Sequence, residues 1–117
     1  MRRYAAELIG TYALVFAGTG AIVINEQTGA LGHFGVAATF GLIVLAMIYA
    51  FGDLSGAHLN PAVTLGFVVA KRFPVKEAAP YIVAQLSGAL LASLTLRFLF
   101  PENATLGATF PAGSEMQ

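Results

Sequence analysis

Apolar residues gather in three long segments of the chain that carry almost no charge. The segments cover about residues 4–24, 34–52 and 78–99. Each is close to the roughly 20 apolar residues that a helix needs to cross the hydrocarbon core of a bilayer. Polar stretches that could shield three such helices from water are lacking in the sequence. The pattern therefore favours three membrane spans over buried helices of a soluble core.

A fourth apolar segment, 61–70, is too short to cross a membrane. Its ten residues would form a helix of about 15 Å, which is half the thickness of a bilayer core. Asn60 is a favourable N-cap, and Pro61 suits the first helical position. Lys71 and Arg72 place positive charge at the other end, where the helix dipole favours it. We predict an all-α membrane protein with three transmembrane helices and one half-helix.

Composition excludes several classes of function. Only 10% of the residues are charged, against about 25% in an average soluble domain. Six basic and six acidic residues give zero net charge, so the chain lacks the positive field that nucleic-acid binding needs. It has no cysteine, and its two histidines are separated by a full span, which makes a metal site improbable. We expect no cofactor, no catalytic residues and no enzyme.

The basic residues predict an orientation in the membrane. Arg2 and Arg3 precede the first span, and three more basic residues lie in the 71–77 segment before the last one. The positive-inside rule then places the N-terminus and this segment in the cytoplasm. A cleaved signal peptide is the alternative for the first span, but the apolar stretch is longer than the usual 7–15 residues.

With this orientation the half-helix must enter and leave the membrane on the cytoplasmic side. It is then a re-entrant segment, and its N-terminus at Asn60 lies near the bilayer midplane. The irregular backbone of residues 55–59 is tolerated at such depth only when it is buried in protein or lines a wet cavity. The positive end of a half-helix repels cations. These features favour a pore for water or a neutral solute.

Residues 55–64 read Ser-Gly-Ala-His-Leu-Asn-Pro-Ala-Val-Thr, which resembles the signature of the aquaporin and glycerol-facilitator family, the major intrinsic proteins. Residues 6–11 resemble the start of that family's first helix, and residues 81–89 resemble its third. The similarity extends over about residues 4–100. The resemblance implies a fold of six spans and two half-helices, built as two inverted repeats.

By this resemblance, residues 1–100 are the first repeat and residues 101–117 are the extracellular loop that connects it to a second. A second Asn-Pro-Ala motif is missing from this chain. We therefore expect an N-terminal half, either an excised fragment or a naturally truncated product, and no complete pore as given. The family also implies a homo-tetramer in the lipid bilayer of the cell membrane.

The resemblance assigns roles to the motif itself. Asn60 would donate a hydrogen bond from its amide to passing water while its oxygen caps the half-helix, although a cap alone is the simpler alternative. Pro61 and Ala62 would pack against the second motif. A ladder of carbonyl acceptors would line the pore, contributed by Gly56, Ala57, His58 and Leu59.

Three residues outside the motif complete the predicted site. Phe40 aligns with the aromatic position of the outer selectivity filter, although lipid contact is an ordinary alternative for a phenylalanine in a span. Glu7 and Gln85 would brace the re-entrant loop, Glu7 through backbone N–H groups or His58 and Gln85 through hydrogen bonds to the loop backbone. A carboxylate at head-group level and a helix–helix contact are the respective alternatives.

The leading hypothesis is half of a passive water channel. Phenylalanine at the filter position is typical of water-selective members, while glycerol facilitators usually carry tryptophan, which this chain lacks. A facilitator of glycerol or another small neutral solute is the first alternative. A non-conducting, truncated membrane protein is the second.

Overall fold

The computed structural model describes residues 1–112 and, within them, contains four α-helices and no strand. The helices are α1 (Arg2–Thr28), α2 (Gly32–Ser55), α3 (Pro61–Val69) and α4 (Val75–Leu99). Of these, α1, α2 and α4 are long and apolar enough to cross a membrane. The nine residues of α3 span about half that thickness. The predicted all-α class is confirmed.

The long helices extend beyond the apolar segments of the sequence. α1 continues through a polar turn to Thr28, where the apolar segment stops near residue 24. It ends because Gly29 adopts φ 68° and its N–H bonds back to the carbonyl of Asn25. α2 ends in the same way at Gly56, with φ 86°. Hydropathy marks the part of a helix that suits lipid, whereas a left-handed glycine marks where the helix stops.

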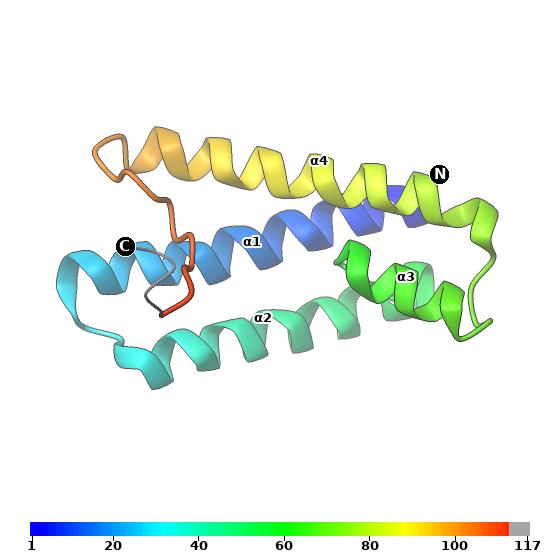
Figure 1. Ribbon diagram of the computed structural model, residues 1–117, viewed down its shortest axis with the longest axis horizontal. Coiled ribbons are helices and arrows are strands. Elements are labelled where there is room, and N and C mark those ends of the chain that lie inside the picture. The colour runs from blue at the N-terminus through cyan, green and yellow to red at the C-terminus, as the bar shows by residue number, and fades with distance from the viewer. Residues whose placement is uncertain (113–117) are drawn as a thin grey trace.

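α1 is the central helix of the bundle. It packs against α4 on one side and α2 on the other, while α3 packs against α4 (Figure 1). In Figure 1, α3 begins beside the N-terminal half of α1 and runs back toward the end where α2 stops and α4 starts. Small residues permit the close approach, because a Cβ at Gly88 of α4 would strike the backbone carbonyl of Leu8 in α1.

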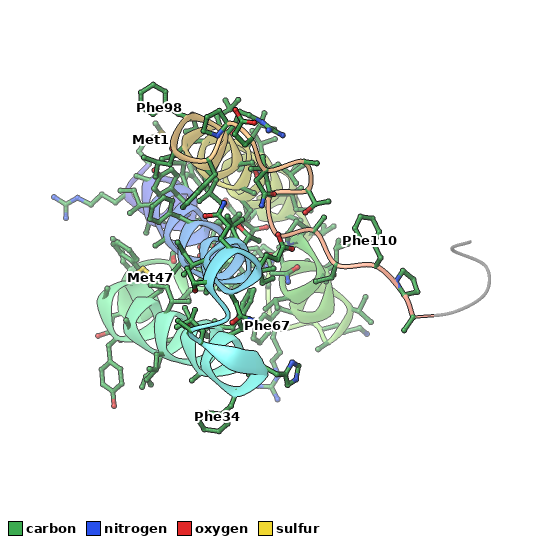
Figure 2. The ribbon with its side chains drawn as sticks, turned by 90° about the vertical axis from the view of Figure 1, so that its left-hand side faces the viewer. Met1, Phe34, Met47, Phe67, Phe98 and Phe110 are labelled. Carbon is green, nitrogen blue, oxygen red and sulfur yellow. The ribbon has the colours of Figure 1, made fainter. Side chains whose placement is uncertain are left out.

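Large apolar side chains cover the outside of the bundle. Phe34 on α2 and Phe98 on α4 are 85% and 84% exposed, and both point away from the helices (Figure 2). The only buried residue of α2 is Ser55, at its last position. A soluble monomer rarely exposes apolar surface on this scale, whereas lipid or further protein would cover it.

The segment after α4 turns back toward α1 (Figure 1). Asn103 holds the turn: its Oδ1 accepts from the N–H of Leu106 at 2.7 Å, and its carbonyl accepts from Arg97 at 2.7 Å. Gly107 then lies so close to α1 that a Cβ would come within 2.6 Å of the Thr19 carbonyl oxygen. Residues 113–117, the end of the predicted 101–117 loop, lie outside the described residues.

Candidate functional site

The segment between α2 and α3 has an unusual backbone. Gly56, Ala57 and Leu59 all have positive φ values, of 86°, 48° and 58°. The left-handed region disfavours residues with a Cβ, so Ala57 and Leu59 need compensating interactions to stay there. We call residues 56–59 the re-entrant loop.

Glu7 of α1 supplies much of that compensation. One carboxylate oxygen accepts hydrogen bonds from the Ser55 hydroxyl at 2.7 Å and from the His58 N–H at 3.1 Å. The other accepts from the Leu59 N–H at 2.9 Å and from the Gln85 amide at 2.7 Å. The Glu7 side chain is 0% exposed, and a buried carboxylate is tolerated when it is so fully hydrogen-bonded.

The sequence predicted hydrogen bonds from Gln85 of α4 to the loop backbone. The structure instead shows that Gln85 bonds to two side chains. Its amide nitrogen donates to the Glu7 carboxylate and, at 2.9 Å, to the Thr64 hydroxyl. The N–H groups of His58 and Leu59, which the Gln85 amide oxygen could otherwise accept, already bond to Glu7. Gln85 Oε1 is buried and has no hydrogen-bond partner among residues 1–112. Gln85 thus contacts the loop through the side chain of Glu7.

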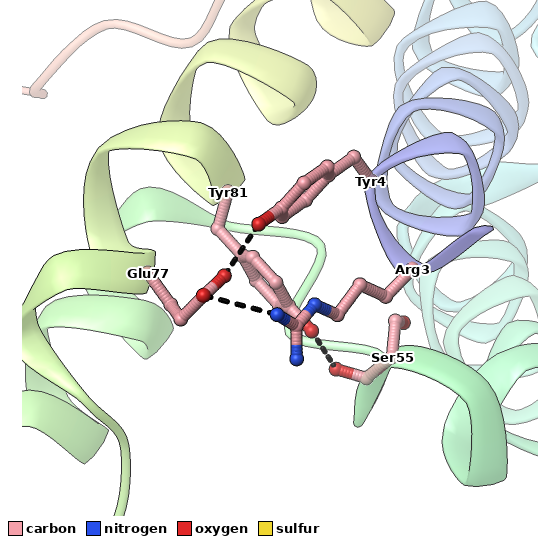
Figure 3. Close-up of polar contacts among 5 residues, drawn as sticks. All are labelled: Arg3, Tyr4, Ser55, Glu77 and Tyr81. Atoms are coloured by element: carbon pink, nitrogen blue, oxygen red, sulfur yellow. Dashed lines mark hydrogen bonds and ion pairs between the residues drawn. The ribbon is translucent and has the colours of Figure 1, made fainter. Parts of the chain in front are cut away.

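Two further residues hold the loop and were missed from the sequence. Thr64 on α3 is 0% exposed, and its hydroxyl lies 2.9 Å from His58 Nδ1. Tyr81 on α4 donates its hydroxyl to the carbonyl of Ser55 at 2.7 Å (Figure 3). The ring of His58 also packs against the Tyr81 ring, with centroids 5.1 Å apart. Thr64 lies in the signature itself, but nothing in the sequence distinguishes Tyr81 from other aromatic residues in spans.

The backbone N–H groups and carbonyl groups of the re-entrant loop differ in their hydrogen bonding. Every N–H has an acceptor inside the protein: Gly56 bonds to the Gly52 carbonyl, Ala57 to the Ser55 hydroxyl, and His58 and Leu59 to Glu7. By contrast, no donor among residues 1–112 bonds to the carbonyl oxygens of the same four residues. The loop therefore offers acceptors without donors.

Asn60 precedes α3 and is its N-cap. The residue is extended, with φ −162°, and its Oδ1 accepts from the Ala62 N–H at 2.8 Å. Its side-chain nitrogen has no hydrogen-bond partner among the described residues, and the residue is exposed. The predicted cap is therefore present, and the amide donor is available to something else.

Asn60 and Phe40 line the same groove. This groove has a volume of about 430 Å³ and runs between α1, α2, α4 and the start of α3. Leu59 and Pro61 line it next to Asn60, and Phe40 of α2 lies against α1, where a Cβ on Gly18 would overlap its ring. The structure thus brings together the motif and the predicted filter position. Within residues 1–112, no three His, Asp or Glu side chains are arranged to hold a metal ion.

A second polar cluster joins the first turns of α1 and α4. Glu77 pairs with Arg3 at 3.0 Å and accepts from the Tyr4 hydroxyl at 2.6 Å (Figure 3). The rings of Tyr4 and Tyr81 meet edge to face, with centroids 5.9 Å apart. This cluster fixes Tyr81, which in turn holds the end of α2.

Comparison with known proteins decides the family. The family model described as "Major intrinsic protein" matches residues 1–115. This chain belongs to the major intrinsic protein family. The family predicted from the motif at residues 55–64 is thus confirmed.

Several plant major intrinsic proteins are similar to this chain. Aquaporin NIP1-4 of Oryza sativa subsp. japonica is 50% identical over 113 residues, which cover 96% of this chain and 41% of that protein. Aquaporin NIP1-1 of Zea mays is 47% identical over 119 residues, covering 100% and 42%. Probable aquaporin NIP4-2 of Arabidopsis thaliana is 52% identical over 100 residues, covering 85% and 35%. The chain spans about two fifths of the length of these relatives.

Proposed function

We propose that this chain forms one half of a passive membrane channel for water. The observation that carries the proposal is the sorting of polar groups in the re-entrant loop, which turns its N–H groups inward and leaves its carbonyl oxygens free. Buried carbonyl groups without partners are costly, so they need water or another hydrogen-bond donor beside them. A file of water molecules passing the loop would supply these donors.

The motif residues take the following roles in this proposal. Carbonyls of the re-entrant loop (Gly56, Ala57, His58 and Leu59) accept hydrogen bonds from water on one half of its path. The amide of Asn60 donates to water at the midplane, while its oxygen stays on the Ala62 N–H. Phe40 narrows the outer part of the same groove. Glu7 positions the loop, and Gln85 positions the Glu7 carboxylate.

A second repeat completes the pore in this proposal. Side chains on α3 remain exposed, with Leu65 and Val69 at 50% and 82%. In the first turn of α3, Pro61 has no N–H and the N–H groups of Ala62 and Thr64 bond to Asn60, but the Val63 N–H has no partner among residues 1–112 and lipid cannot supply one. Pro61 and Ala62 would pack against the matching motif of the second repeat. Residues 1–100 then form the first repeat, and the segment from 101 connects to the second on the extracellular side.

The surroundings follow from the same family relationship. We place the protein in the cell membrane with its N-terminus in the cytoplasm, because five of its six basic residues lie on that side of the helices. We expect a homo-tetramer with one pore per subunit. The chain provides a path and no reacting groups, so we assign it no enzymatic activity.

A chimera tests the proposal. In the chimera, this chain would replace the segment of Aquaporin NIP1-1 from Zea mays to which it aligns over 119 residues. The rest of that relative would then supply the second repeat. Stopped-flow light scattering on proteoliposomes would measure water and glycerol permeability. We expect rapid water flow through the chimera, slow glycerol flow, and neither through the chain alone. Glycerol permeation as fast as that of water would favour the facilitator function instead.

The variant Asn60→Asp separates the pore role from the cap role. Aspartate keeps the capping oxygen but removes the amide donor and adds a negative charge at the groove. We expect the chimera to fold and to lose most of its water permeability. Asn25→Asp is the matched control, because Asn25 also accepts backbone N–H groups through Oδ1, at 3.2 Å from Leu31 and 2.8 Å from Gly32, but lies outside the groove. Equal permeability of the two variants would contradict the pore role of Asn60.

A further inference from the structure

A second groove lies between the first halves of α1 and α4, away from the proposed pore. Its volume is about 620 Å³, and nearly all of its lining is apolar. We call it the α1–α4 groove. It is lined by Met1, which caps α1, by Tyr4, Ala5 and Leu8 of α1, and by Ala79, Pro80, Val83, Ala84 and Ser87 of α4.

The shape of the groove follows from its small residues and from the contacts at its two ends. At one end Gly88 brings α4 against the Leu8 carbonyl, so the two helices close the groove there. At the other end Tyr4 reaches Glu77 across the helix pair (Figure 3). Between these contacts Ala5 and Ala79 are too short to fill the space. The groove thus extends over about 10–12 Å of each helix, at 1.5 Å per residue.

Positive charge without an internal partner lies at the open end. Lys76 is three residues before Ala79 on α4 and so lies on the groove face one turn nearer the helix start, and Arg2 directly follows Met1, which lines the groove where α1 begins. Neither forms an ion pair within residues 1–112. The nearby carboxylate, Glu77, is paired with Arg3 at 3.0 Å and does not neutralise them.

We propose that the α1–α4 groove binds an acyl chain of an anionic phospholipid, whose head group is held by Arg2 and Lys76. The phospholipid belongs to the leaflet on the side where α1 begins. An apolar trench that leads to uncompensated basic residues at the membrane surface matches the two parts of such a lipid. A transmembrane helix fits less well, since its diameter is about 10 Å and its contact would extend beyond this short trench. The inference does not depend on channel activity.

Native mass spectrometry of the full chain in detergent tests the lipid specificity. The probes are phosphatidylglycerol and phosphatidylcholine with identical acyl chains. Because each basic residue near a membrane surface strengthens anionic lipid binding about fivefold, we expect phosphatidylglycerol to be preferred by about thirtyfold. The double variant Arg2→Gln/Lys76→Gln should lose this preference. Lys71→Gln/Arg72→Gln, which removes two basic residues beyond the groove, should keep it.

A groove-filling variant tests the place of the acyl chain. Ala79→Phe puts a ring into the groove and should abolish retention of phosphatidylglycerol. Ala46→Phe is the matched control, since Ala46 is an exposed alanine of α2 outside the groove. The assignment would be overturned if both variants retain phosphatidylglycerol or if both lose it. It would also be overturned if the wild-type protein shows no preference for the anionic lipid.

Crosslinking to the wild-type chain gives an answer even if Ala79→Phe fails to fold. Phosphatidylglycerol with a photoreactive diazirine on the acyl chain would be activated in liposomes, and the labelled residues would be mapped by mass spectrometry. We expect labels concentrated on residues 1–8 and 79–87, several times above those on the exposed face of α2. Labels spread evenly over all exposed helix faces would refute a specific site.

Discussion

Replacing Glu7 by glutamine tests whether one carboxylate holds the re-entrant loop. The two side chains have nearly the same shape, so packing is preserved. Glu7 accepts from four donors, two on each oxygen. In Glu7→Gln one oxygen becomes an NH₂ group that faces two donors, whichever way the amide turns. Two hydrogen bonds to a charged acceptor are then lost at once.

The size of the effect follows from those bonds. A hydrogen bond to a charged group contributes about 1.5–3 kcal/mol, so two contribute about 3–6 kcal/mol. Removing a buried charge offsets part of this loss. We expect the free energy of unfolding to fall by about 3 kcal/mol. The same change should speed amide hydrogen exchange at His58 and Leu59 by about a hundredfold, because it acts directly on their N–H groups.

Denaturant titration in detergent micelles and hydrogen exchange read by mass spectrometry are the two assays. Glu26→Gln is the matched control, since Glu26 is exposed and accepts one hydrogen bond, from Asn103 at 3.1 Å. This control should change the free energy of unfolding by no more than about 0.5 kcal/mol. If Glu7→Gln is as stable as the control and exchange at His58 and Leu59 is unchanged, the carboxylate does not hold the loop.

Three further variants test other contacts, each by its free energy of unfolding in detergent. Gly88→Ala should lower it by about 1–3 kcal/mol, because the new Cβ meets the backbone of α1, whereas Gly41→Ala, which meets nothing within 4 Å, should raise it slightly. Tyr81→Phe should lower it by about 1 kcal/mol through loss of the bond to Ser55, whereas Tyr49→Phe, at an exposed position without a hydrogen bond, should not. Asn60→Ala should lower it by about 1 kcal/mol through loss of the cap, and no change would mean that the Ala62 N–H finds another acceptor.

The sequence was sufficient to predict the helices but not the contacts that fix the loop. The apolar segments and the cap at Asn60 predicted three long helices and a half-helix because hydropathy and capping are local properties. Tyr81 could not be recognised, since an aromatic residue in a span has many ordinary places. Its hydroxyl matters only because α4 passes the last residue of α2, which is a relation between segments 26 residues apart.

Gln85 shows the same limit of sequence-based prediction, here for a polar residue whose importance was recognised but whose partners were not. A polar residue in a span predicts a buried partner, and the structure contains one. The choice between the loop backbone and the side chains of Glu7 and Thr64 depends on distances of a few ångströms. Residue type predicts that a buried polar side chain will find hydrogen-bond partners, and only the packed structure determines which neighbours bond to the Gln85 nitrogen and that its oxygen has none among residues 1–112.

The arrangement around Glu7 links the strain of the loop to its proposed use. Positive φ values hold Ala57 and Leu59 in the left-handed region, which costs free energy for residues with a Cβ. Glu7 and Ser55 accept the N–H groups of Ala57, His58 and Leu59, and no donor among residues 1–112 bonds to the loop carbonyls. A path lined only by acceptors would also attract cations, but the positive end of α3 lies next to the loop and opposes them. Neutral donors such as water satisfy both conditions, so in the proposed channel the strained backbone and the half-helix would act together as one selective element.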